Sequence, residues 1–150
     1  MKKPFVTKDL IEKISKEIPT PFHIYDEKGI RENARALLKA FSWNKGFKEY
    51  FAVKATPNPF ILKILQEEGC GTDCSSYTEL LMSDACGFHG HDIMFSSNVT
   101  PAQDFVLADK LGVIINLDDF THIDFLEKTI GHIPETICCR YNPGGLFKIE

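Results

Sequence analysis

An α/β fold with a parallel sheet is predicted for this chain of 150 residues. After one amphipathic helical segment, short apolar runs alternate with helices of about three turns, and this alternation is typical of right-handed βαβ units. A glycine follows each of the later helices, where a helix commonly ends in the left-handed conformation. The composition, with 43% apolar and 25% charged residues, is that of an average globular domain and excludes a disordered polymer, a collagen repeat and a coiled coil.

The helices are identified by apolar spacing and by the residues at their ends. The segment 27–41 repeats apolar residues at the spacing of one helical face. Three later segments begin at capping residues: Asn58 precedes a proline, and Ser76 and Thr100 each open a capping box. The predicted helices are residues 27–41, 58–69, 76–87, 100–112 and 118–131.

Short apolar runs between these helices predict the strands. They are residues 22–25, 49–53, 71–73, 93–96, 113–116 and 136–141, and residues 142–145 are predicted to form a loop. The last five runs form either an open doubly wound sheet or the first part of a (β/α)8 barrel, and periodicity does not separate the two. In both arrangements ligands bind at the carboxyl ends of the strands, so that edge is the place to look for function.

Charge and composition restrict the partners and the compartment. The net charge of −4 gives no basic surface for nucleic acid, and no apolar run approaches the roughly 20 residues that span a bilayer. The N-terminus shows no secretory signal, and the odd set of five cysteines is read as reduced thiols. We therefore expect a cytoplasmic protein that binds neither nucleic acid nor a membrane.

Three charged residues at strand ends are candidates for chemistry. Lys54 ends the strand at 49–53, where burial would favour the neutral amine that a Schiff-base lysine requires; the alternative is a stem that snorkels to solvent. Asp73 ends the next strand and is expected to face the same edge. Arg140 ends the last strand. It is either a fixed cation for a carboxylate or a cofactor oxygen, or a member of a structural ion pair.

Four further residues are expected along this edge. They are Ala52, Ser76, Glu79 and Asn98. Ser76 and Glu79 also suit a purely structural role as helix caps, which does not exclude a place in the site. Loop polarity alone is a sufficient explanation for Asn98.

A zinc site is one competing interpretation of the cysteines. Cys70, Cys74, Cys86 and His89 lie close together in the sequence, and the C-x3-C spacing is acceptable for zinc. However, the first two cysteines flank a predicted strand and the third ends a helix. We therefore expect buried, inert thiols and no metal.

Four ordered motifs resemble one enzyme family. The segment from Phe51 to Ala55, which contains Lys54, is similar to the pyridoxal-phosphate attachment segment of group IV decarboxylases, whose barrel is alanine-racemase-like. The other motifs are T-P-x-x-x-Y-D at 20–26, G-x-G-x-D-x-S-S-x-T-E at 69–79 and R-x-N-P-G at 140–144. Because the matches keep their order over nearly the whole chain, the family resemblance is specific.

The resemblance implies a role for each residue at the edge. Lys54 would be the lysine that carries pyridoxal 5'-phosphate, and Asp73 and Arg140 would bind this cofactor. The fold implied is α/β: a partial (β/α)8 TIM-type barrel of about five βα strands, with the family's C-terminal β-domain absent. Residues 1–26 would be an N-terminal extension and strand, and residues 27–150 the N-terminal portion of the barrel domain.

The implied reaction is decarboxylation of a small amino acid. The motifs look most like those of enzymes that convert meso-diaminopimelate to lysine, although Thr78 is more similar to ornithine-type enzymes. A barrel's phosphate site typically lies in the loops after strands seven and eight, so we expect the chain to be inactive alone. The resemblance implies that the longer enzyme is a homodimer. An ornithine or arginine decarboxylase, a racemase and a non-catalytic pyridoxal-binding barrel remain as alternatives.

Overall fold

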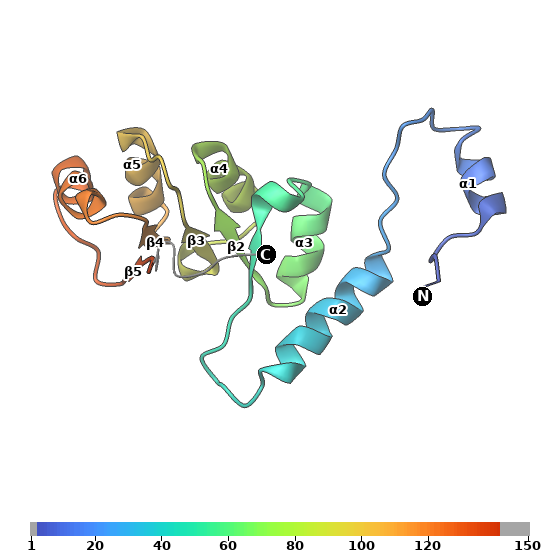
Figure 1. Cartoon of the computed structure of the whole chain (residues 1–150), viewed down its shortest axis with the longest axis horizontal. Helices are drawn as coiled ribbons and strands as arrows, with labels where there is room; N and C mark the ends of the chain where they lie inside the picture. Colours follow the sequence, from blue (N-terminus) through green and yellow to red (C-terminus); the bar gives the residue numbers. More distant parts are fainter. Residues whose placement is uncertain (1–2, 142–150) are drawn as a thin grey trace, which may run out of the picture.

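A parallel sheet of five strands forms the centre of the molecule (Figure 1). The computed structural model describes residues 3–141, so the predicted loop at 142–145 lies outside the described residues. Along the chain the elements are α1 (Lys8–Ile14), α2 (Glu27–Ala40), β1 (Tyr50–Ala52), the 3-10 turn η1 (Val53–Ala55), α3 (Pro59–Glu67), β2 (Gly71–Cys74), α4 (Tyr77–Ala85), η2 (Gly90–Asp92), β3 (Ile93–Phe95), α5 (Ala102–Lys110), β4 (Ile114–Leu117), α6 (Thr121–Ile130) and β5 (Ile137–Cys139).

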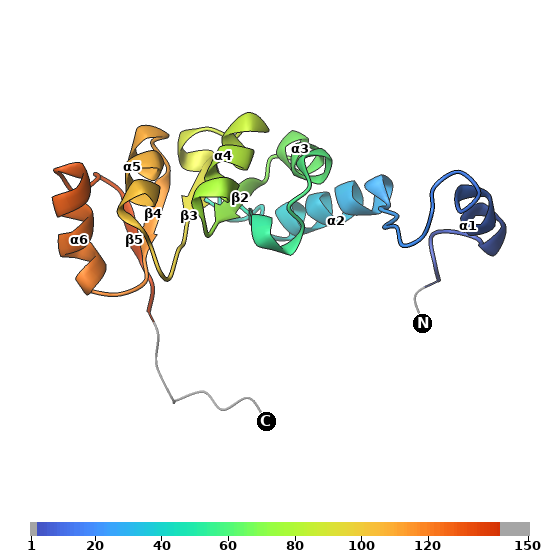
Figure 2. The same ribbon diagram turned by 90° about the horizontal axis from the view of Figure 1, so that it is seen from above.

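The order of the strands distinguishes a barrel from an open doubly wound sheet. Each strand pairs in parallel with the next one along the chain, in the order β1-β2-β3-β4-β5 without a reversal. The helices α3, α4, α5 and α6 contact one another in sequence and line the same side of the sheet (Figure 2). A doubly wound sheet reverses its order and carries helices on both faces. The fold is therefore part of a (β/α)8-type barrel, which confirms that prediction and excludes the open sheet.

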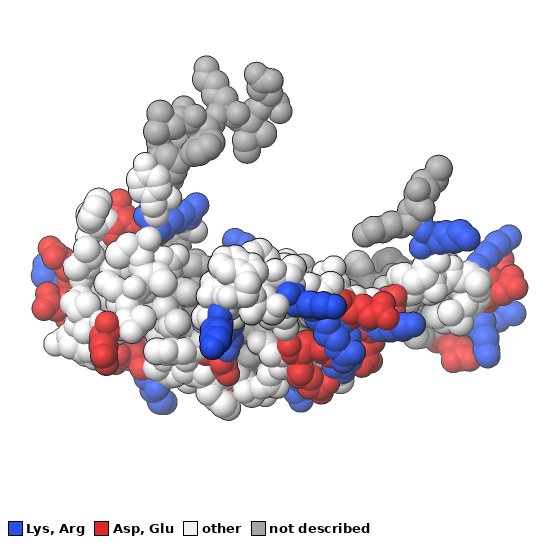
Figure 3. Space-filling view, turned by 90° about the horizontal axis from the view of Figure 1, so that it is seen from below, with Lys and Arg blue, Asp and Glu red and all other residues white. Residues whose placement is uncertain are grey.

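The two faces of the sheet differ in burial. In β4, Ile115 and Leu117 face the helices and are fully buried, whereas Ile114 and Asn116 face the other way and are half-buried. Side chains alternate between the faces of a strand, so the half-buried set marks the inner face of the barrel. Seen from below, charged side chains are sparse over the strands and gather over α2 and near α1 (Figure 3).

Helix α2 is fixed to α3 by apolar contact and by ion pairs. Ala34 is buried against α3. Arg31 donates to Glu67 at 2.6 Å and to Glu68 at 3.0 Å, and Arg35 donates to Glu68 at 2.6 Å. These hydrogen bonds hold the pKa of Glu68 below its ordinary value. The network anchors the helix that leads into β1.

Most of the predicted helix ends are confirmed. The glycines after α3, α4, α5 and α6 all have positive φ, as a left-handed C-terminal position requires; they are Gly69, Gly87, Gly112 and Gly131. Asn58 caps α3 by accepting from the amide of Phe60 at 3.0 Å. The capping box at Thr100 is wrong: α5 begins at Ala102, and the Thr100 hydroxyl donates to the carbonyl of Ser97 instead.

The N-terminal part departs from prediction in one segment. Residues 22–25 were predicted to form a strand, but they form no strand in the structure. A strand needs a partner for its backbone groups, and no strand in residues 3–141 pairs with this segment. The amphipathic start of the chain forms α1, which has no buried residue and lies apart from the sheet (Figures 1 and 2). No helix in the described range is long and apolar enough to cross a bilayer.

Gly71→Ala is expected to destabilise the sheet. A Cβ at this position of β2 would lie 2.5 Å from the carbonyl oxygen of Asp92 and 2.8 Å from the ring of Tyr50, on the inner face. Overpacking of this kind costs about 1–3 kcal/mol in the free energy of unfolding, measurable by urea denaturation. Gly46→Ala is the control, because its Cβ would have an ordinary nearest contact of 3.6 Å. Equal stability of the two variants would contradict the packing described.

Candidate active site

Lys54 lies at the carboxyl edge of the sheet, where the sequence placed it. It follows β1 by two residues and belongs to the turn η1. Its side chain is exposed, as in the reading in which the lysine stem extends to solvent. The reason is that no further layer covers the inner face next to β1 within the described residues. The amine is therefore accessible to a ligand that enters from this edge.

Asp73 lies on the neighbouring strand and shares this edge. The register of β1 and β2 places it directly beside Ala52, two residues before Lys54. It is half-buried, and it accepts a hydrogen bond from the hydroxyl of Ser96, which follows β3. An amine, a carboxylate and a hydroxyl that end or follow three successive strands thus share one edge of the sheet.

The ionisation of Asp73 reflects opposing influences. Burial raises the pKa of the Asp73 carboxyl above its ordinary value, because desolvation disfavours the charged form. The hydrogen bond from Ser96 and the positive charge of Lys54 both act to lower this pKa. The negative charge of Glu79 adds to the increase. The net direction is upward, so the carboxylate carries an electrostatic cost in the folded chain.

Ser76 and Glu79 cap the helix that begins beside Asp73. The hydroxyl of Ser76 accepts from the amide of Glu79 at 3.4 Å, as the capping box predicts. The Glu79 carboxylate does not return to Ser76: it accepts from the amide of Ser75 at 2.8 Å and from the hydroxyl of the same residue at 3.1 Å. Both residues are therefore committed to the first turn of α4, and the charge of Glu79 acts on Asp73 from that position.

Two polar residues near this edge make contacts that the sequence did not specify. Ser96, rather than the exposed Asn98, makes the contact to Asp73. Asp104 of α5 is buried and accepts from the amide of Tyr77 at 3.1 Å, so it caps α4 from the next helix. A polar residue at a helix start was the only local signal for Asp104, and it did not specify a partner on another helix.

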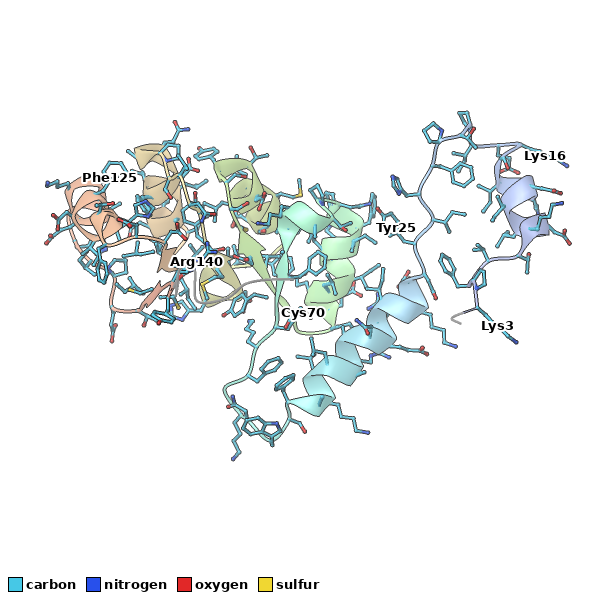
Figure 4. All side chains as sticks on the ribbon, in the orientation of Figure 1. Lys3, Lys16, Tyr25, Cys70, Phe125 and Arg140 are labelled. Carbon is cyan, nitrogen blue, oxygen red and sulfur yellow. The ribbon has the colours of Figure 1, made fainter. Side chains whose placement is uncertain are left out.

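Arg140 follows β5, the strand farthest from β1 in the sheet, and forms an ion pair there. Its guanidinium donates to Asp118 at 2.8 Å, and it lies on the strand side, beneath the helices (Figure 4). A hollow of about 490 Å³ adjoins the pair and includes the exposed Phe120 and Tyr141. The structural ion pair considered from the sequence is thus present, and the structure does not bring Arg140 into contact with the Lys54–Asp73 group.

The cysteines considered as zinc ligands point to different places. Cys70 packs in the small cluster at α2 and α3 (Figure 4). The sulfur of Cys74 lies 3.2 Å from the hydroxyl of Ser83, and burial raises the pKa of this thiol to about 11. Cys86 contacts the carbonyl of Pro59 at 3.8 Å. Among residues 3–141, no group of three or more metal-ligating side chains comes together.

Comparison with known proteins identifies the family. A family model described as "Pyridoxal-dependent decarboxylase, pyridoxal binding domain" matches residues 27–145. The chain therefore belongs to the pyridoxal-dependent decarboxylases, a family whose cofactor is pyridoxal 5'-phosphate.

Individual relatives support the same assignment. Protein TabA of Pseudomonas amygdali pv. tabaci is 39% identical over 92% of this chain, and the diaminopimelate decarboxylase of Thermoplasma acidophilum is 32% identical over 89%. The chain spans 32% of the length of each of these relatives.

Solved structures agree with the fold. The lysine decarboxylase of Selenomonas ruminantium superimposes with a TM-score of 0.77 at 25% identity, covering 86% of this chain and 33% of that one. The diaminopimelate decarboxylase of Helicobacter pylori, solved with L-lysine, gives a TM-score of 0.68 at 28% identity, covering 79% and 30%. The parallel sheet is thus the one found in pyridoxal-phosphate barrel enzymes.

Asp73→Asn is expected to increase stability near neutral pH in the cofactor-free protein. Because folding raises the pKa of Asp73, the contribution of this group to stability is complete below the ordinary pKa of aspartate and is lost as the pH rises through the raised value. Asparagine stays neutral and still accepts from Ser96. Urea unfolding across a pH series should show the advantage of the variant growing with pH, and an advantage that grows toward acid pH would contradict the assignment.

Proposed function

We propose that this chain supplies the lysine-bearing part of a pyridoxal-phosphate-dependent amino-acid decarboxylase, with Lys54 as the attachment residue. The observation that carries the proposal is the position of Lys54: an accessible amine at the carboxyl edge of β1, beside Asp73 of the adjacent strand. In parallel βα folds this edge binds the ligand. The match of residues 27–145 to the pyridoxal-binding family supports the same reading.

The residues at this edge fit the aldehyde end of the cofactor. Lys54 provides the amine, and the register places Ala52, with its small side chain, beside Asp73. Asp73 provides a carboxylate on the neighbouring strand, and Arg140 would supply a cation from the far side of the mouth. When bound, pyridoxal phosphate accepts the electron pair that remains as carbon dioxide leaves.

The protein's own residues have two tasks in this reaction. The Lys54 amine would hold the cofactor, and as a free amine it would carry a proton at Nζ at this edge. Asp73, as a carboxylate, stabilises the positive charge of the Lys54 ammonium. Ser76 and Glu79 keep the start of α4 in place, so the mouth keeps its shape while ligands exchange.

The substrate we favour is meso-diaminopimelate, with lysine as the product. Relatives named diaminopimelate decarboxylase cover most of this chain, among them that of Thermoplasma acidophilum at 32% identity. An ornithine- or arginine-type decarboxylase is the second candidate, because Thr78 resembles the ornithine enzymes at the start of α4. A racemase or a non-catalytic pyridoxal carrier would use the same lysine but would show no release of carbon dioxide from an amino acid.

We further propose that the activity belongs to a longer, cytoplasmic homodimer and that the chain is inactive alone. Residues 27–150 would be the N-terminal portion of its barrel domain, and residues 1–26 an extension. Five strands leave β1 and β5 as sheet edges, and a barrel's phosphate loops typically follow strands seven and eight. The remaining strands would supply these loops and cover the inner face.

Lys54→Arg tests the proposal in the longest protein that contains this chain. Borohydride reduction should fix pyridoxal phosphate onto the peptide that contains Lys54, as detected by mass spectrometry. The arginine variant should lose this label, and release of carbon dioxide from meso-diaminopimelate should fall to below about one-thousandth, because the side chain keeps its charge but loses the nucleophile.

Lys63→Arg is the matched control, because Lys63 is exposed on α3 and lies outside the mouth. It should keep both the label and the activity. A label on a different lysine would remove Lys54 from its role, and a label without release of carbon dioxide from diaminopimelate, ornithine or arginine would favour the non-catalytic carrier.

A further inference from the structure

Two residues stand in equivalent positions on either side of Asp73. The register of the sheet places Asp73 beside Ala52 of β1 and beside Met94 of β3. Lys54 follows the first of these neighbours by two residues, and Ser96 follows the second by two residues. Asp73 therefore lies between the strand that leads to Lys54 and the strand that leads to Ser96.

The contact on the β3 side is specific. The hydroxyl of Ser96 donates to the Oδ1 atom of Asp73. The amide of Ser96 donates to the carbonyl of Cys74 at 2.8 Å, which extends the β2–β3 ladder by one step and fixes the position of the serine backbone. A hydroxyl held in this way satisfies one oxygen of a half-buried carboxylate and leaves the other oxygen free for a partner at the mouth.

We propose that Ser96 is a positioning residue of the pyridoxal site: its hydroxyl, which donates to Oδ1 of Asp73, holds the Asp73 carboxylate at the edge that it shares with Lys54. This inference rests on the proposed function, because it gives the serine a purpose only if Lys54 carries the cofactor. It adds a residue of β3 to a site otherwise built from β1 and β2. The serine acts through Asp73 and does not itself contact the reacting atoms.

The charges around Asp73 show why such a residue is needed. Burial and the charge of Glu79 both favour the protonated carboxyl, whereas Lys54 and the hydroxyl of Ser96 favour the carboxylate. The charged groups that act on Asp73 are Lys54 from η1 and Glu79 from α4. Attachment of a cofactor to Lys54 changes the charge of that amine, so the serine is the influence that persists when the lysine is occupied.

Ser96→Ala tests the inference in the longest protein that contains this chain. Carbon-13 NMR of labelled aspartate side chains, with the Asp73 signal assigned by its loss in Asp73→Asn, gives the titration midpoint of Asp73 directly. Removing a hydrogen bond to a carboxylate should raise this midpoint by roughly one pH unit. The pH profile of the visible absorbance of the lysine-bound cofactor should shift in the same direction.

Two further variants separate positioning from general damage to the fold. Ser96→Thr keeps the hydroxyl and should restore both the midpoint and the absorbance profile. Ser97→Ala removes a hydroxyl from the next residue, whose carbonyl rather than its hydroxyl bonds to Thr100, and should leave both unchanged.

The outcomes are distinguishable. An unchanged Asp73 midpoint in Ser96→Ala overturns the inference, and so does a shifted midpoint with an unshifted cofactor profile, because the serine then does not act on Lys54. If the unsubstituted protein takes no cofactor on Lys54, the proposed function fails, and the role of Ser96 in a pyridoxal site fails with it. The NMR midpoint then still shows whether Ser96 controls the charge of Asp73.

Discussion

The candidate site depends on the parallel register of the first three strands. Ala52, Asp73 and Met94 are direct neighbours across β1, β2 and β3. A slip of one residue between two strands would turn every side chain of a strand to the opposite face. In β2 such a slip would move Asp73 against the helices and bring Thr72, which is fully buried, onto the open inner face. Burial on the helix side therefore fixes the register, and the register assembles the site.

Features that rest on local chemistry were predictable from the sequence. The left-handed glycines after the helices, the cap at Asn58 and the alternation of strands and helices each depend on a few neighbouring residues, and the structure confirms them. The choice between a barrel and an open sheet was not predictable in this way. It depends on which strands become neighbours, and the residues of a single βα unit do not encode that.

The missed strand and the missed side-chain contacts share a physical cause, which is dependence on partners far along the chain. The segment 22–25 has the alternation of a strand, but an extended segment becomes a strand only when another one satisfies its backbone groups. For Lys54 the sequence leaves burial and exposure both open, because the exposure of this side chain depends on what covers the inner face. The contact from Ser96 to Asp73 and the cap from Asp104 to Tyr77 join residues on different βα units. A pattern within one unit therefore does not predict them.

The cap of α4 and the charge at the mouth are physically linked. Glu79 stabilises the first turn of α4 through the amide and hydroxyl of Ser75, and a carboxylate is favourable at a helix N-terminus. The same negative charge lies close enough to Asp73 to raise its pKa. Glu79 thus stabilises the first turn of α4 and disfavours the ionised state of Asp73. Lys54 and Ser96, which follow the two adjoining strands, favour the ionised state. The ionisation of Asp73 consequently depends on Lys54, Glu79 and Ser96, which belong to successive βα units. A substitution of the capping residue Glu79 therefore changes the pKa of Asp73, although Glu79 makes no hydrogen bond to it.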